Sequence, residues 1–327
     1  MRRHHSSAVR ILFAGLLAVA SAAVAGAQST IGEEGAIQFL LPIGARSLGM
    51  GQAVAATATG TDALWWNPAL VARGPREAAF HFSKILTIET DAGGAVVIPV
   101  QRVGAFALSL RYLNEGEQEA TDRVTGEVTG VFSTTTAVIG ATFATTFSRR
   151  FAAGLTYKLL RLDFHCTGVC DRPAHAPQTI ALDLGAQYIA ASDSLVTFGL
   201  AFRNAGPRLQ VNDSPQADPL PVRADFGVAY APRFAQLPKE ARVRVAADVV
   251  ARVSGGYAPG YRFGAELSWI ERYQARGGYV VEGPTGSGAT FGLGLSSGKL
   301  QIDLARMLIS SGSEGGSPSY LSLRYLF

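Results

Sequence analysis

The feature that most constrains the fold of this chain is an alternation of apolar and polar residues, which begins near Glu77 and continues to the last residue. In one segment, apolar residues occupy every second position: Phe106, Leu108, Leu110 and Tyr112. A period of two indicates β-strands with one apolar face and one face of small or polar residues. The segments are about nine to fourteen residues long, the length that a tilted strand needs to cross a bilayer.

Counting these segments predicts about fourteen strands, an even number, as antiparallel bacterial barrels require. We expect the strands to start near Glu77, Gly93, Val103, Val131, Phe151, Thr179, Ser194, Leu220, Ala241, Gly260, Arg272, Ala289, Lys299 and Ser319. Short turns (101–102, 148–150, 191–193 and 296–298) alternate with longer polar stretches (114–130, 165–178, 204–219 and 310–318). Short periplasmic turns and long extracellular loops are typical of outer-membrane barrels. Both termini are then expected on the periplasmic side.

The composition agrees with such a barrel. Hydrophobic residues make up 48% of the chain and charged residues 17%, with 37 glycines. No stretch after residue 27 approaches the roughly eighteen to twenty apolar residues of a membrane helix. A soluble β protein could share this composition, but it has no reason to alternate the lengths of its connections.

Charged residues at strand centres are expected to face the lumen, because an Arg or Lys at mid-bilayer costs about 2 to 4 kcal/mol. This predicts an inward-facing network of Arg111, Arg203, Arg223, Arg242, Arg244, Arg262, Arg276 and Arg324 with Asp183, Asp225, Asp248, Glu266 and Asp303. The network either packs structurally around a plug or lines a polar path. The charges must be paired in both cases, because an unpaired buried charge is costly.

The first 27 residues are predicted to be a secretory signal peptide. Arg2, Arg3 and Arg10 precede an apolar run at 11–24 and an Ala-Gly-Ala ending, so cleavage is expected before Gln28. Removing this segment takes away three arginines and no acids, and the formal charge falls from +4 to +1. The exported chain therefore lacks the basic surplus that nucleic-acid binding requires.

Residues 44–72 differ from the alternating segments. They are rich in Gly and Ala, which lets backbone pack against backbone, and they end in Trp65, Trp66, Asn67 and Pro68. Asp62 is placed to cap a short helix at 63–66, and Pro68 is expected to end that turn and let another begin at Ala69. We interpret residues 28–75 as a small helical hatch that plugs a barrel formed by residues 76–327.

This stretch resembles the N-terminal hatch of the PorV/PorQ family of bacterial outer-membrane proteins, relatives of the FadL long-chain fatty-acid channel. The family signature reads roughly G-A-R-x-L-G-M-G-x-A-x-V-A, then D-A-x-x-W-N-P-A. The matching residues are Gly44, Ala45, Arg46, Leu48, Gly49, Met50, Gly51, Ala53, Asp62, Ala63, Trp66, Asn67, Pro68 and Ala69. Ala55 departs from the signature, which has Val there. The resemblance implies an outer-membrane barrel of fourteen strands with a hatch in its lumen.

The sequence offers little support for a nucleotide-binding or catalytic site. Gly49-Met50-Gly51 begins like a dinucleotide-binding turn, but position 54 is Val and no buried parallel strand precedes it. No nucleophile elbow is present, and Ser, His and acid residues cannot be assembled into a triad from the sequence, so we predict no enzyme and no cofactor. His81 is interpreted as a lumen or interface histidine.

Cys166 and Cys170 are the only cysteines, and in an exported chain the pair predicts a disulfide in a loop. The neighbouring His165 and His175 make a metal site conceivable, but four ligands are not evident, and we predict none.

The last strand ends in Phe327, with Leu321, Leu323 and Tyr325 on the same face. This looks like the C-terminal signal that the barrel-assembly machinery recognises in outer-membrane proteins. The expected surroundings are therefore outer-membrane lipid, and the expected location is the bacterial outer membrane.

Two functions follow from the resemblance. A PorV-like barrel would be a partner or scaffold protein in type IX-like secretion or surface assembly, with a filled lumen and an exposed apolar patch on its outer loops. A FadL-like barrel would be a passive channel for hydrophobic small molecules, with a continuous apolar pocket around Leu64, Trp65 and Trp66 and a gap in its wall. The hatch motif favours the first.

Overall fold

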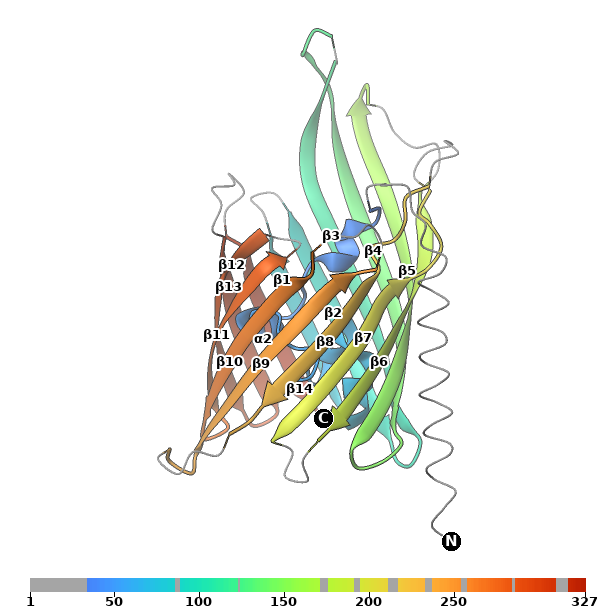
Figure 1. Ribbon diagram of the computed structural model, residues 1–327. Helices are drawn as coiled ribbons and strands as arrows, with labels where there is room; N and C mark the ends of the chain where they lie inside the picture. Colours follow the sequence, from blue (N-terminus) through green and yellow to red (C-terminus); the bar gives the residue numbers. More distant parts are fainter. Residues whose placement is uncertain are drawn as a thin grey trace.

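The computed structural model describes residues 34–85, 89–122, 124–170, 176–190, 195–210, 217–232, 237–253, 258–283, 286–309 and 317–327. Within these residues, fourteen antiparallel strands close into one barrel, and β14 pairs with β1 (Figure 1). The fold predicted from the alternation is confirmed. The signal peptide lies outside the described residues.

The strands follow one another around the barrel in chain order. Their bounds are β1 Glu77–Lys84, β2 Thr90–Val100, β3 Gly104–Thr121, β4 Val128–Thr146, β5 Phe151–Gly168, β6 Gln178–Ile189, β7 Val196–Ala205, β8 Arg223–Tyr230, β9 Ala241–Arg252, β10 Gly260–Trp269, β11 Tyr273–Gly283, β12 Gly286–Ser297, β13 Leu300–Ile309 and β14 Ser319–Leu326. We call the end that carries Glu77 and Phe327 the short-turn end, and the opposite end the long-loop end. Strand parity predicts that the short-turn end faces the periplasm.

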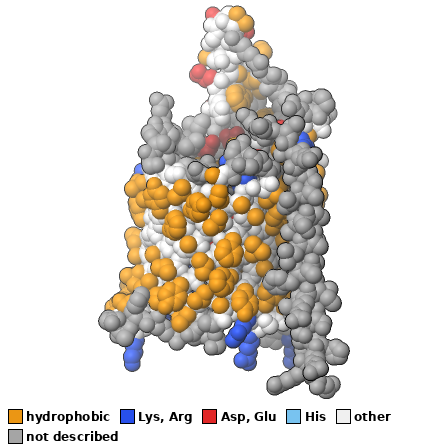
Figure 2. All heavy atoms as spheres, in the orientation of Figure 1, with side chains coloured by type: hydrophobic (Ala, Val, Ile, Leu, Met, Phe, Trp, Pro, Cys, Tyr) orange, Lys and Arg blue, Asp and Glu red, His pale blue; other side chains and the backbone are white. Residues whose placement is uncertain are grey.

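The wall has an apolar outer surface and a polar inner one. On β3, Phe106, Leu108, Leu110 and Tyr112 are exposed, whereas the intervening Arg111 is buried. Figure 2 shows apolar side chains covering the height of the barrel wall in a broad belt, with Lys and Arg side chains projecting below it. Among the described residues, no helix is long and apolar enough to span a membrane.

The stretch 114–130, which we expected to be a loop, is mostly strand. β3 continues to Thr121 and β4 begins at Val128, and Glu117 pairs with Ser133 across them. Asp122 closes the tip by accepting hydrogen bonds from the N–H groups of Val124 and Thr125, both at 2.8 Å. The extension rises well above the rest of the long-loop end (Figure 1). The loop prediction failed because both faces of this sheet meet water, which removes the apolar alternation.

The hatch fills the lumen with short helical turns. They are η1 Ile37–Leu40, α2 Ala45–Gly49, η2 Gly60–Asp62, α3 Ala63–Trp66 and η3 Pro68–Arg73. The chain enters near the outer parts of β3–β5, crosses the lumen, and leaves at the short-turn end into β1 (Figure 1). α2 packs against β12 and β13, and η3 packs against β4, β5 and β6.

Glycine allows the hatch backbone to touch the wall directly. Gly51 has a φ of 59°, and a Cβ on it would lie 2.7 Å from the backbone nitrogen of Tyr279. A Cβ on Gly264 would lie 2.8 Å from the backbone carbon of Met50. The hatch therefore fits against β10 and β11 only because these positions carry no side chain.

Candidate functional site

The ten predicted hatch residues lie together in the lumen. Nine of them are buried, and Trp65 is partly buried. They are Gly44, Ala45, Arg46, Gly49, Gly51, Asp62, Trp65, Trp66, Asn67 and Pro68. The motif therefore specifies one body of packed and hydrogen-bonded groups.

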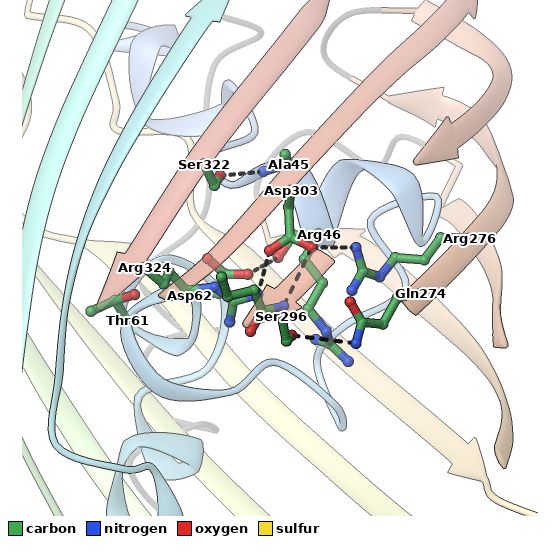
Figure 3. Close-up of polar contacts among 12 residues, drawn as sticks. Ala45, Arg46, Thr61, Asp62, Gln274, Arg276, Ser296, Asp303, Ser322 and Arg324 are labelled. Atoms are coloured by element: carbon green, nitrogen blue, oxygen red, sulfur yellow. Dashed lines mark hydrogen bonds and ion pairs between the residues drawn. The ribbon is translucent and has the colours of Figure 1, made fainter. Parts of the chain in front are cut away.

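An ion-pair network locks the hatch to one side of the barrel. Glu266 on β10 accepts hydrogen bonds from Arg46 Nε at 3.1 Å, Arg276 Nε at 2.7 Å and Arg244 Nη1 at 3.2 Å. Asp303 on β13 accepts from Arg276 Nη1 at 2.6 Å and completes the chain of charges. Figure 3 shows Arg46 and Arg276 converging on this region from the hatch and the wall. One hatch cation is thus held by a wall carboxylate that also binds cations of two other strands, β9 and β11.

Most of the predicted inward-facing charges form ion pairs. Asp248 instead accepts a hydrogen bond from the Ala55 N–H at 2.8 Å, and the guanidinium of Arg262 lies 5.3 Å from the Trp66 ring centre. The wall pairs are Arg111–Asp91, Lys158–Asp183, Arg203–Asp225, Arg276–Asp303 and Arg324–Asp303, and Arg223 pairs with Glu34 of the hatch. Arg242 also forms a pair, but outside the buried network. It lies at the short-turn end, where its side chain is 73% exposed and pairs with Glu271. A residue this near a strand end meets water, so the mid-bilayer argument does not apply to it.

Asp62 does not cap the helix that follows it, and that prediction is wrong. α3 has no side-chain cap hydrogen bond from Asp62, whose backbone is itself helical. The buried carboxylate instead accepts from Ser47 Oγ at 3.4 Å and lies 3.8 Å from Nε2 of His81 on β1. Contacts with Ser47 and His81 inside the lumen have replaced the local cap.

His81 and Ser322 complete a polar chain that the sequence did not reveal. Nδ1 of His81 lies 2.8 Å from Oγ of Ser322 on β14, and the same Oγ accepts from the backbone N–H of Ala45 at 2.8 Å. Figure 3 shows the contact between Ser322 and Ala45. These Ser, His and Asp side chains are 0–2% exposed and are covered by the hatch, so the arrangement fastens the hatch and offers no nucleophile to a substrate.

Asn67 joins two parts of the hatch to the wall. Its Nδ2 donates to the carbonyl oxygens of Ala55 at 2.7 Å and Ala186 at 3.1 Å, and its Oδ1 accepts from the N–H of Ala69 at 3.1 Å. Asn67 therefore caps η3, which begins at Pro68, one residue before the expected Ala69. The side chain is fully buried, and both its amide nitrogen and its amide oxygen form hydrogen bonds.

Trp65 and Trp66 of α3 lie beside a small pocket that η1 borders on its other side. Trp66 donates from Nε1 to the carbonyl oxygen of Ile43 at 3.2 Å, and the guanidinium of Arg203 lies 5.6 Å from its ring centre. The Trp65 N–H, by contrast, finds no hydrogen-bond partner among the described residues. The pocket is lined by Phe39, Leu40, Leu41, Ile43, Trp65, Trp66, Arg111, Val138, Lys158 and Arg203.

The pocket is nearly closed. It leaves about 20 Å³ for a water-sized molecule, which is little more than one such molecule occupies. Phe39 of η1 closes it on the outer side. The Lys158 ammonium lies over the Phe39 ring, with Nζ 4.7 Å from the ring centre. Sequence reasoning missed Phe39 and Lys158 as pocket residues.

An outer apolar cluster continues from the pocket toward the long-loop end. It consists of Ala36, Phe39, Val138, Leu160, Leu162, Ala181, Leu209 and Leu220, with Phe164 packed against it. Phe164 lies on the outer part of β5, four residues before that strand ends. Apolar side chains thus run from the outer extension to the hatch tryptophans.

A second cavity lies at the short-turn end and differs in character. Its volume is about 880 Å³, and polar groups from β9, β10, β11 and the neighbouring turns line it, among them Arg242, Arg244, Ser268 and Gln274. Glu266 also lines this vestibule, so the network that holds Arg46 separates it from the hatch. The outer pocket is therefore small and nearly closed, with more apolar than charged side chains, whereas the vestibule is large and carries more polar groups.

Cys166 and Cys170 are joined in a disulfide near the outer end of β5. Cys166 lies within the strand rather than in a loop, because β5 extends to Gly168. His175 lies outside the described residues. Within the described part of the chain, no group of three or more His, Cys, Asp and Glu side chains is arranged to hold a metal ion.

No family model and no curated protein sequence matches the chain. Several solved structures match it in fold. The toluene transporter TodX of P. putida has a TM-score of 0.64 and 13% identity, covering 88% of this chain and 99% of TodX. The toluene transporter TbuX of Ralstonia pickettii has a TM-score of 0.59 and 14% identity, covering 88% and 99%.

A FadL homologue of Pseudomonas aeruginosa has a TM-score of 0.54 and 13% identity, covering 88% of this chain and 99% of its own. The chain therefore has the fourteen-strand fold of FadL-like outer-membrane barrels. These matched proteins are described as transporters or as a FadL homologue, not as enzymes. Identities this low establish the fold, and the substrates belong to those proteins.

Proposed function

We propose that this protein is an outer-membrane channel for small hydrophobic molecules, in which the hatch is the barrier that a ligand must pass. The observation that carries the proposal is the pocket beside Trp65 and Trp66, where the outer apolar cluster meets the hatch. A site lined mainly by apolar and aromatic side chains, with few polar groups, is the usual form of a small-molecule site. This function was the alternative to the partner role that the hatch motif favours.

The charges around the pocket favour an uncharged ligand. Arg111, Lys158 and Arg203 line it, but each is already paired with a wall carboxylate. The unpartnered group is the Trp65 N–H, which can donate one hydrogen bond. A small aromatic or aliphatic molecule, with at most one weak acceptor, suits this lining. The structural neighbours TodX and TbuX are toluene transporters, which makes toluene a sensible first probe.

The closed pocket requires that η1 move before a ligand binds. Phe39 fills the outer side of the pocket, and its segment is tied down by the Glu34–Arg223 ion pair and by Arg111, which donates to the Gln38 carbonyl oxygen at 3.1 Å. A ligand that displaces Phe39 replaces one apolar contact by another. The ligand covers the pocket surface that Phe39 leaves, which lowers the free-energy cost of the movement.

Tryptophan fluorescence tests this proposal because two of the three tryptophans line the pocket and the third lies far from it. Trp65 and Trp66 line the pocket, whereas Trp269 is 43% exposed on the outer surface near the short-turn end. In the Trp269→Phe variant, toluene is expected to change the emission saturably. In the Trp65→Phe/Trp66→Phe variant, the remaining Trp269 is expected to show no saturable change. Equal responses in both variants, or none in either, would contradict a toluene-type site in the hatch.

A PorV-like partner role is the second candidate, favoured by the hatch motif and by the outer extension of β3, β4 and β5. The extension carries exposed apolar residues at its tip and edges, including Val124, Val128 and Val169. Native mass spectrometry of the gently extracted protein separates the two roles. A protein that co-purifies at defined stoichiometry supports a partner in secretion or surface assembly, whereas a bound apolar small molecule without a protein supports the channel.

Location in the outer membrane is part of both proposals. The FadL-like fold belongs to bacterial outer-membrane proteins, and the apolar belt of the wall suits lipid. Phe327 stacks on Tyr325 at 6.4 Å and lies beside Arg76, where the barrel-assembly machinery would meet it. Deleting Phe327 is expected to lower the yield of assembled barrel in the outer membrane, and an unchanged yield would remove that role.

A further inference from the structure

We infer that the short-turn end of the barrel is a docking surface for an acidic, extended segment of a periplasmic protein, which enters the vestibule beside Lys239, Arg242 and Arg244. This inference goes beyond the channel function and does not depend on it. It rests on the charge of this end, on the vestibule, and on the weak internal pairing of the cations at its mouth.

Exposed cations outnumber exposed acids at the short-turn end. Among the described residues there, the only exposed acids are Glu240 and Glu271, and the exposed cations are Arg73, Arg76, Arg102, Arg149, Arg150, Lys239, Arg242, Arg272 and Lys299. Figure 2 shows such side chains projecting below the apolar belt. The formal charge of the whole exported chain is close to neutral, so this excess is concentrated on one face. A face of one sign attracts and orients partners of the opposite sign.

The vestibule opens within this basic face. Its volume of about 880 Å³ lies in the upper part of the range of about 300 to 1,000 Å³ that is typical of binding pockets. Its lining combines polar groups, such as Arg242 and Arg244 from β9 and Ser268 from β10, with apolar residues such as Leu237 and Pro238. Such a mixed lining suits a peptide segment that carries carboxylates.

The cations at the mouth are available to a partner. Arg242 pairs with Glu271, but both side chains are more than 70% exposed, and an ion pair in water contributes only about 0 to 1 kcal/mol. Arg244 is 40% exposed and shares Glu266 with Arg46 and Arg276, so one carboxylate serves three cations. A carboxylate from a partner would complete this unbalanced set.

The position of the vestibule favours a polypeptide over lipid headgroups. The side chains of Glu266, Ser268 and Gln274 that line it belong to the inner face of the wall. A headgroup anchored in the surrounding bilayer stays outside that wall, whereas a chain segment can pass between the turns into the lumen. An occupant would also reach Glu266, the residue that holds Arg46 of the hatch.

The test uses the full exported protein in nanodiscs of zwitterionic lipid and a labelled polyglutamate peptide of about ten residues as the probe, because steering of this kind is electrostatic. Fluorescence anisotropy is expected to report saturable binding that weakens with salt. The Lys239→Glu/Arg242→Glu variant is expected to weaken binding by about tenfold or more. The Arg149→Glu/Arg150→Glu variant makes the same charge change in the β4–β5 turn, away from the vestibule, and is expected to weaken binding by less than about twofold.

Equal losses in the two variants would overturn the proposal, because the peptide would then sense only the overall charge of the face. Failure of the wild-type protein to bind the peptide would overturn it as well. Stronger heat stability in anionic than in zwitterionic nanodiscs, lost equally in both variants and without peptide binding, would assign the cations to lipid headgroups instead. Heat-modifiability on gels checks that each variant is folded.

Discussion

Arg46 in the hatch donates from Nε to Oε2 of Glu266 on β10 at 3.1 Å, and both side chains are almost completely buried. Glu266 also binds Arg244 and Arg276. One wall carboxylate therefore contacts three cations, one of which belongs to the hatch. This single position connects the hatch, the wall and the vestibule.

Replacing Glu266 by Gln is expected to destabilise the folded protein by about 3 to 5 kcal/mol, because removing one partner of a buried ion pair leaves the others uncompensated. Urea unfolding in detergent micelles measures the loss. Glu271→Gln is the matched control, because it also breaks an Arg–Glu pair, but an exposed one worth about 0 to 1 kcal/mol. Equal effects of the two substitutions would mean that the buried network does not hold the hatch.

Gly278 and Gly277 offer a second matched pair on β11. A Cβ on Gly278 would lie 2.6 Å from Cα of Gly51 in the hatch, whereas the nearest atom to a Cβ on Gly277 is 3.9 Å away. Gly278→Ala is therefore expected to push the hatch from the wall and to cost about 1 to 3 kcal/mol, as overpacking does. Gly277→Ala is expected to change stability by less than about 0.5 kcal/mol.

The accessibility of the hatch tryptophans to acrylamide distinguishes a local shift from a general loss of stability. Gly278→Ala is expected to increase quenching of Trp65 and Trp66 in a Trp269→Phe background. Unchanged quenching would mean that β11 shifts to make room for the added Cβ and that the hatch stays in place. Gly277→Ala serves as the baseline in the same background.

Asn67→Ala is expected to impair hatch order or barrel assembly. The substitution removes the hydrogen bonds donated to the carbonyl oxygens of Ala55, which is buried, and Ala186, which is partly buried. A buried polar group left without a partner costs about 1 to 3 kcal/mol. Asn67→Asp keeps the acceptor for the Ala69 N–H but loses both donors, so it is expected to be at least as damaging. Heat-modifiability and yield in the outer membrane measure the effect. Normal values for both variants would remove the structural role of Asn67.

The sequence predicted the barrel because lipid on one side and a polar lumen on the other impose alternation on every strand. The expected starts at Gly93 and Val131 lie three residues from the observed starts of β2 and β4. The outer extension escaped prediction for the same physical reason. Where Glu117 and Glu119 of β3 stand above the lipid, the two faces of the sheet no longer differ in solvent, and the alternation disappears.

The site was predicted less completely than the fold. Arg46, Asn67 and the tryptophans could be identified because they lie in a segment whose composition and motif differ from those of the strands. The partners of these residues were not identified, because contacts such as Asp62 with His81, or Phe39 with Lys158, join a hatch residue to a wall strand and depend on how the hatch is seated in the barrel. Asp62 illustrates the error that results: a local rule predicted a helix cap, and a buried partner displaced it.

Glu89 provides a test of the long-loop end, outside the membrane-spanning part of the strands. Burial, and then the nearby charge of Glu115, raise the pKa of Glu89 above its ordinary value of 4.5. A carboxyl whose pKa is raised by folding is destabilising when ionised, so the turn between β1 and β2 is expected to gain stability as the pH falls through the raised pKa. The gain is complete once the pH is below the ordinary value.

Glu89→Gln removes the charge and is expected to stabilise this turn at pH 7 but not at about pH 4, where the wild-type carboxyl is already protonated. Hydrogen exchange of the Ile85 amide, which donates to the Glu89 carbonyl oxygen at 3.2 Å, measures the local effect. Glu127→Gln, at the exposed tip of the outer extension, is the control and is expected to leave that amide unchanged. A difference between Glu89→Gln and wild type that persists unchanged at about pH 4 would assign the effect to packing, because the charge of Glu89 is absent from both proteins there.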